Sequence, residues 1–160
     1  MHRSGVPNRE PAQRQDSLPR RRGLITAIAV GGVLGAEARY GLSLAIPHSD
    51  RQFPWSTVLV NTSGCLLIGA LMALLLELPA PHWLARPFLG VGVLGGYTTY
   101  SSFAVEVQRL LLHHRPLVAL GYVAVTVIGC AAAVWLSSAV ATHFARVARR
   151  RRGVIAADLP

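Results

Sequence analysis

Apolar residues gather in four long stretches that short polar segments separate. The stretches run over Leu24 to Ile46, Trp55 to Leu78, Pro87 to Leu112, and Leu117 to Thr142. Each exceeds the roughly 20 residues that a helix needs to cross a bilayer. Four such stretches joined by short loops fit poorly into the core of a soluble domain. The pattern therefore predicts an all-α membrane protein with four transmembrane helices.

The third stretch departs from the pattern of a plain membrane helix. Residues 90–106 read GVGVLGGYTTYSSFAVE, a glycine-rich apolar run followed by hydroxyl side chains. Glycine admits unusual dihedral angles and hydroxyls can bond freed backbone groups, so Gly95 to Thr98 predicts a break in this helix. Freed carbonyls are good ligands for hard cations. Irregular backbone at bilayer depth is tolerated only inside protein or beside a wet cavity, so the segment is a candidate functional site.

Polar residues in the other stretches add further candidates. Glu37 and Arg39 are costly at membrane depth and should point inward or reach an interface. Asn61 belongs to a polar patch in the second stretch, where it either bonds a neighbouring helix or takes part in a site. A polar stripe on the fourth stretch repeats every four residues and consists of Tyr122, Thr126 and Cys130.

Composition supports the membrane class, while the charge distribution sets an orientation. The chain is 52% hydrophobic and 14% charged, which is too apolar for an ordinary soluble domain. All 16 basic residues are arginine, and most precede the first stretch or follow the last. The positive-inside rule then predicts that both termini lie in the cytoplasm, and the basic ends are expected to contact anionic lipid. The expected location is the plasma membrane. No nucleic-acid-binding module accompanies the net charge of +9.

Cysteine spacing predicts neither a disulfide framework nor a metal site. Cys65 and Cys130 both fall in the middle of apolar stretches, where a thiol behaves as a small apolar residue.

Taken together, these motifs resemble the CrcB/Fluc fluoride channel family. The matching strings are GGVLGAEARY at residues 31–40, VNTSG at 60–64 and GGYTTYSSFAVE at 95–106, and the resemblance covers residues 31–142. It implies small four-helix subunits with a broken third helix that assemble as antiparallel dimers, with two fluoride pores and a central structural sodium ion (Na+). The implied function is passive, fluoride-specific efflux that lowers cytoplasmic fluoride without enzyme chemistry.

The resemblance also implies roles for individual residues. Sodium would be bound by the backbone carbonyls of Gly95 and Thr98, Arg39 would line a vestibule, and Glu106 and Cys130 would support the pore. The fluoride path would be formed by Asn61, Tyr100, Ser101, Ser102, Phe103, Tyr122 and Thr126. Two residues depart from the family pattern, because Tyr100 replaces a phenylalanine and Cys130 stands where a hydroxyl is expected.

Assembly and rival functions remain open at this stage. The excess of arginine on one side favours a heterodimer with an oppositely oriented homologue, although a homodimer is not excluded. The alternatives to a channel are a small multidrug-type proton-coupled transporter, which Glu37 would serve, and a noncatalytic membrane assembly subunit. The predicted organisation is a disordered basic cytoplasmic tail over residues 1–22, a transmembrane channel domain over 23–143 and a basic tail over 144–160.

Overall fold

The structure is a computed structural model that describes residues 10–77 and 81–157, and the side chains of residues 20–77 and 81–147. Its described residues form helices and no strand, which confirms the all-α prediction. In chain order the elements are α1 (Glu10–Ala45), α2 (Trp55–Glu77), the π-helix η1 (Arg86–Leu94), α3 (Gly95–Tyr97), α4 (Ser101–Leu112) and α5 (Pro116–Ala157).

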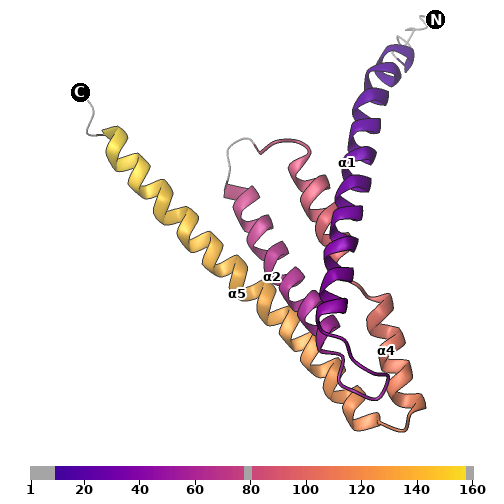
Figure 1. Cartoon of the computed structure of the whole chain (residues 1–160). Helices are drawn as coiled ribbons and strands as arrows, with labels where there is room; N and C mark the ends of the chain where they lie inside the picture. Colours follow the sequence, from indigo (N-terminus) through magenta and orange to yellow (C-terminus); the bar gives the residue numbers. More distant parts are fainter. Residues whose placement is uncertain (1–9, 78–80, 158–160) are drawn as a thin grey trace, which may run out of the picture.

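Helix α1 lies against η1 and α3, and glycine permits the close approach of the two backbones (Figure 1). A Cβ atom at Gly31 would lie 2.6 Å from the Phe88 carbonyl oxygen, and one at Gly35 would lie 2.7 Å from the Tyr97 amide nitrogen. Both distances are shorter than a real Cβ contact allows. Gly31 and Gly35 therefore let η1 and α3 approach α1 closely.

Helices α2 and α5 form the second packed pair, side by side in Figure 1. A Cβ atom at Gly69 would lie 2.7 Å from the carbonyl oxygen of Val134 on α5. Helix α4 closes one end of this pair through a buried cluster of Val58, Leu110, Ala119 and Tyr122. The segment from η1 to α4 thus contacts both α1 and the α2–α5 pair.

That segment is not one continuous helix. Helix α3 ends at Tyr97, Thr98 is extended with ψ of 155°, and α4 begins at Ser101. The chain therefore changes direction within the stretch that the sequence singles out.

The hydrophobic surface agrees with a membrane protein. Among the described residues, α2 and the part of α5 from Pro116 to Val147 are long and apolar enough to cross a membrane, with mean hydropathies of 2.1 and 2.3. Large apolar side chains such as Val33, Leu67 and Ile128 are at least half exposed, which a soluble monomer rarely tolerates over many positions. Helix α1 is more polar, and the third stretch is divided among shorter elements.

Both predicted tails overlap helices. Helix α1 begins at Glu10, so the backbone is helical over residues 10–22, where the sequence predicts disorder, and α5 continues to Ala157. Pro11 fits the first turn of α1, where its missing N–H has no partner to lose. Once a helix is nucleated each added residue brings one hydrogen bond, and arginine, glutamine and leucine extend helices well. Residues 1–9, 78–80 and 158–160 lie outside the described residues. Helices α1 and α5 run without a break across the predicted boundaries at 22/23 and 143/144, so the domain boundaries stay predictions.

Candidate functional site

The Asn61 side chain holds the backbone at the interruption. Its Nδ2 donates to the Thr99 carbonyl oxygen at 2.9 Å, and its Oδ1 accepts the Thr99 N–H at 2.8 Å. Both residues are buried, with 7% of each exposed. A primary amide presents one donor and one acceptor side by side, so it can pair with a peptide group as a second strand would. We name this pair of bonds the Asn61 clamp.

The clamp redirects the hydrogen bonds of the third segment. In a continuous helix the Thr99 N–H would bond the Gly95 carbonyl, but here it donates to Asn61. The Ser102 N–H would bond the Thr98 carbonyl, but it donates to Thr99 Oγ1 at 3.1 Å. The carbonyls of Gly95 and Thr98 thus both lose their usual helical donors.

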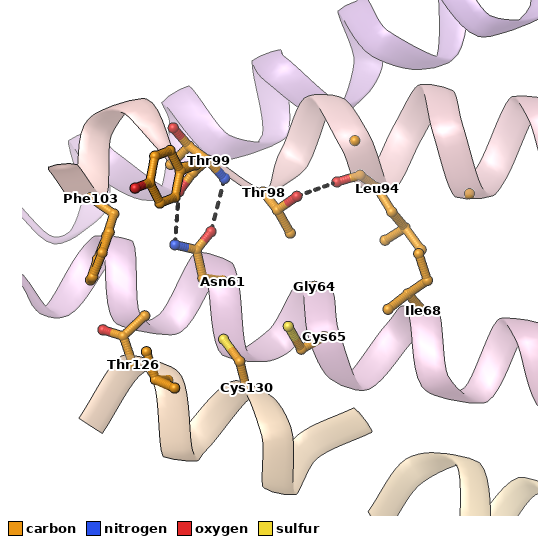
Figure 2. A pocket seen from close by; sticks show the side chains of 14 residues that line it. Asn61, Gly64, Cys65, Ile68, Leu94, Thr98, Thr99, Phe103, Thr126 and Cys130 are labelled. Atoms are coloured by element: carbon orange, nitrogen blue, oxygen red, sulfur yellow. Dashed lines mark hydrogen bonds between the residues drawn. The ribbon is translucent and has the colours of Figure 1, made fainter. Parts of the chain in front are cut away.

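A cavity of about 510 Å³ opens beside the clamp, between α2, the interrupted segment and α5 (Figure 2). Seven of the residues predicted for the site line it: Asn61, Gly95, Thr98, Tyr100, Phe103, Thr126 and Cys130. Thr126 Oγ1 bonds the Tyr122 carbonyl of its own helix at 2.8 Å. The cavity therefore combines mostly apolar walls with a few polar groups.

Two aromatic rings stand at the start of α4. Tyr100 and Phe103 have ring centroids 6.1 Å apart, and Phe103 also lies 5.1 Å from the ring of Tyr122. Phe103 packs against the buried cluster of α2, α4 and α5, whereas Tyr100 is 81% exposed. The Tyr100 ring can therefore contact any molecule that binds at the start of α4.

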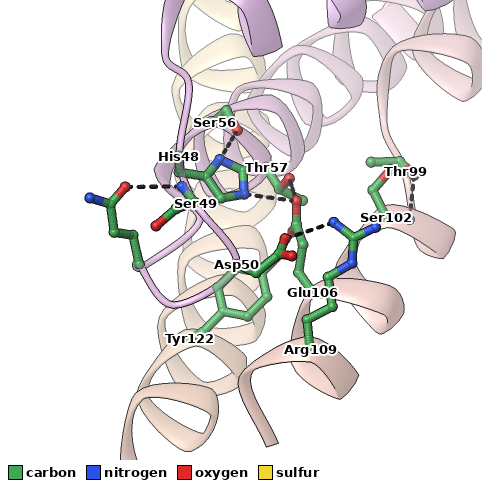
Figure 3. A network of polar contacts seen from close by, with 11 residues as sticks. His48, Ser49, Asp50, Ser56, Thr57, Thr99, Ser102, Glu106, Arg109 and Tyr122 are labelled. Atoms are coloured by element: carbon green, nitrogen blue, oxygen red, sulfur yellow. Dashed lines mark hydrogen bonds and ion pairs between the residues drawn. The ribbon is translucent and has the colours of Figure 1, made fainter. Parts of the chain in front are cut away.

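Glu106 is the centre of a second polar group, which we name the Glu106 cluster (Figure 3). Thr57 donates its hydroxyl to Glu106 Oε1 at 2.8 Å, and Tyr122 donates to Oε2 at 2.6 Å. His48 Nε2 lies 3.4 Å from Oε1, while its Nδ1 is 3.2 Å from the Ser56 hydroxyl. The carboxylate is thereby held by side chains from α2, α5 and the α1–α2 loop.

The remaining predicted site residues do not line the cavity. Tyr122 is fully buried and directs its hydroxyl to Glu106, so the stripe with Thr126 and Cys130 does not form one continuous lining. Ser101 is exposed, and Ser102 bonds Thr99. Arg39 is half-buried on α1. The structure therefore brings most, but not all, of the predicted residues together.

Three residues that hold the Asn61 clamp or the Glu106 cluster were not predicted from the sequence. Thr99 supplies the backbone that Asn61 binds, and Thr57 and His48 bind Glu106. Thr57 lies one helical turn before Asn61 and so shares its face of α2, which was an available signal. No local pattern marks His48.

The sequence model of a family described as "CrcB-like protein, Camphor Resistance (CrcB)" matches residues 26–138. The chain belongs to the CrcB family. This CrcB chain is 46% identical to the "Fluoride-specific ion channel FluC 2" of Thermobifida fusca over 81% of its own length and 96% of the relative. Proteins with the same name from Nocardia farcinica and Streptomyces avermitilis are 44% and 40% identical, over 79% and 76% of this chain and 91% and 77% of their own lengths.

Proposed function

We propose that this CrcB chain is the subunit of a fluoride-specific ion channel that lowers cytoplasmic fluoride by passive efflux. The observation that carries the proposal is the identity of 40–46% to relatives named as fluoride-specific ion channels, over about three quarters or more of the chain. Ion conduction requires no catalytic group, so we assign no enzyme activity.

The chemistry of the cavity supports an anion path. Fluoride is small and strongly hydrated, so a pore must replace its water with compact donors. Asn61 has two N–H groups and the clamp uses one, which leaves a second donor at the cavity wall. The positive ring edges of Tyr100 and Phe103 can face an anion as well. Ser101 and Ser102, at the start of α4, would extend the path beyond the cavity.

The interrupted segment also suits a structural sodium ion. Gly95 and Thr98 line the cavity, and the helical donors of both carbonyls bond elsewhere. Carbonyl oxygens with free lone pairs are what a hard cation prefers. These two carbonyls and their copies in a second subunit would bind the ion. The positive charge of the ion would offset the repulsion between the facing carbonyl oxygens.

The channel is proposed to be an antiparallel dimer whose subunits each span the membrane four times, with the third helix broken at Thr98. In the described residues Arg20 lies 5.2 Å from the Trp83 ring, so the basic part of α1 and the α2–η1 connection share one end of the molecule. Arg109 pairs with Asp50 at the opposite end. The first end, richer in arginine, would face the cytoplasm.

The partner subunit is proposed to be an oppositely oriented homologue. Charge asymmetry disfavours insertion in both orientations, which an antiparallel homodimer would require. Relatives named FluC 2 and FluC 3 are both found in Streptomyces avermitilis, so more than one such protein can occur together in one organism. A homodimer remains the alternative.

Anion efflux from liposomes tests the proposal directly. The full chain is reconstituted alone and with a homologue, and fluoride and chloride release are followed with ion-selective electrodes. We expect rapid fluoride release and no chloride release above empty liposomes. If neither preparation releases fluoride or chloride, the channel proposal is contradicted. Proton-driven drug uptake that is abolished by Glu37→Gln would favour the transporter instead.

A further inference from the structure

The only two cysteines of the chain face each other across the α2–α5 interface. Cys65 lies on α2 and Cys130 on α5, and both are free and half-buried. Figure 2 shows the two sulfur atoms at adjacent positions on the facing helices. Two residues that lie far apart in the sequence therefore form a pair.

The thiol pair is open to the cavity rather than sealed between helices. Cys65 and Cys130 both line the 510 Å³ cavity together with Asn61, Thr98 and Thr126. A solute that enters the cavity can therefore reach both sulfur atoms. No carboxylate or imidazole is among the residues that line the cavity.

The donor set determines which metal the pair can hold. Among the described residues no group of three or more His, Cys, Asp or Glu side chains gathers to hold an ion, so the thiols cannot complete a four-coordinate zinc site here. Thiolates are soft ligands that select soft cations such as Cu+. A cation that is satisfied by two sulfur ligands, such as Cu+ or Ag+, matches a pair.

We propose that Cys65 and Cys130 form a two-coordinate binding site for a soft monovalent cation of the Cu+ and Ag+ class. On binding, two S–H bonds break, two metal–sulfur bonds form and two protons leave to water. The product is a bis-thiolate complex with one net negative charge. Both protons are displaced because the thiolate is the form that binds a metal ion.

A metal bound at this position would obstruct the proposed anion path. The complex would occupy part of the cavity wall and place a negative charge beside Asn61 and Thr126, which repels fluoride. This consequence rests on the proposed channel function, whereas the binding itself does not.

Silver binding to the purified full chain tests the site. Silver nitrate is added in chloride-free buffer, excess metal is removed, and retained silver is measured by mass spectrometry. We expect about one Ag+ per chain, with affinity at least about tenfold weaker in Cys65→Ser and in Cys130→Ser. Met72→Leu, which removes a soft thioether elsewhere on α2, is the matched control and should bind as the wild type does.

Proton release gives an independent measurement that needs no variant. In weakly buffered solution near neutral pH, each silver ion bound by the wild-type chain should release about two protons. Release of about one proton, or full binding by either serine variant, would show a single-thiol adduct and overturn the site. An equal loss of binding in Met72→Leu would also overturn it.

The effect on flux separates the two proposals. Silver added to liposomes in nitrate and fluoride salts should inhibit fluoride efflux of the wild-type chain, and dithiothreitol should restore it. If silver binds stoichiometrically but does not inhibit fluoride efflux, the claim that the bound metal obstructs the anion path is overturned. Silver binding to a chain that conducts no fluoride keeps the metal site and contradicts the channel.

Discussion

Asn61 and Thr57 lie one turn apart on α2, yet they hold the third segment in different ways. Asn61 pairs with the backbone of Thr99, whereas Thr57 bonds the side chain of Glu106. The Asn61 clamp therefore does not depend on which side chain stands at position 99. The Glu106 cluster depends on particular hydroxyls at fixed distances. In this chain an amide holds a backbone interruption, while a carboxylate and its donors anchor an intact helix.

The largest effect is expected for Asn61→Ala. It removes both bonds of the clamp and leaves the buried N–H and C=O of Thr99 without those partners, which costs about 3 kcal/mol. Fluoride efflux from liposomes should fall about tenfold or more, because the proposed anion path also loses a donor. Thermal unfolding in detergent measures the stability.

Ser138→Ala is the control for this experiment. The Ser138 hydroxyl bonds carbonyls of its own helix, so its removal should change stability and flux little. If Asn61→Ala behaves like Ser138→Ala, the clamp does not hold the interruption.

Tyr122→Phe should have the next largest effect. It deletes a 2.6 Å hydrogen bond to Glu106 from a fully buried hydroxyl, and bonds to charged groups contribute about 2 kcal/mol each. Thr57→Val removes the donor to the other carboxylate oxygen. If the Glu106 cluster acts as a unit, the double variant will lose a different amount of stability from the sum of the two single losses. Strict additivity would show two independent contacts.

His48→Ala should destabilise the chain less, by about 1 kcal/mol. His48 lies 3.4 Å from Glu106 and its side chain is 22% exposed, so water can partly replace it. The exposed His113, replaced by alanine, provides the comparison in the same thermal measurement. A loss as large as that of Tyr122→Phe would place His48 among the principal donors of the cluster.

Arg109→Gln should have the smallest effect, about 0.5 kcal/mol or less. Arg109 and Asp50 pair at 2.9 Å, but both side chains are more than half exposed and screened by salt. Unfolding measured at low and at high salt should converge for the variant and the wild type. A difference that persists at high salt would mean that the pair contributes more than surface attraction.

Helical class and family membership were predictable because their signals are local. Four apolar stretches and the strings around Asn61 and Gly95 are each contained within a few turns of helix. The bounds of α2 follow the hydrophobic pattern closely, beginning at Trp55 as predicted. The helix over residues 10–22 was missed, because proline and charge indicate disorder only when no helix lies beside them to be extended.

The hydrogen-bond partners of the polar residues could not be predicted from local sequence patterns. Asn61 meets Thr99, and Glu106 meets both Thr57 and His48, through contacts that only the packed helices create. Tyr122 shares a helical face with Thr126, but a small rotation decides whether its hydroxyl meets a cavity or a carboxylate. The sequence predicts which residues are polar, whereas packing decides which of them face each other.

The glycine contacts between helices also order the assembly of the chain during synthesis. Gly31 packs against Phe88, and Gly69 packs against Val134, so the earlier residue of each pair must wait for a much later one. Helices α1 and α2 are therefore synthesised before their final neighbours have been translated. The α1–η1 pair can close once η1 has been made, whereas the α2–α5 pair must wait for α5. The interval in which α2 has no partner is therefore the stage at which this protein is open to capture by other membrane proteins.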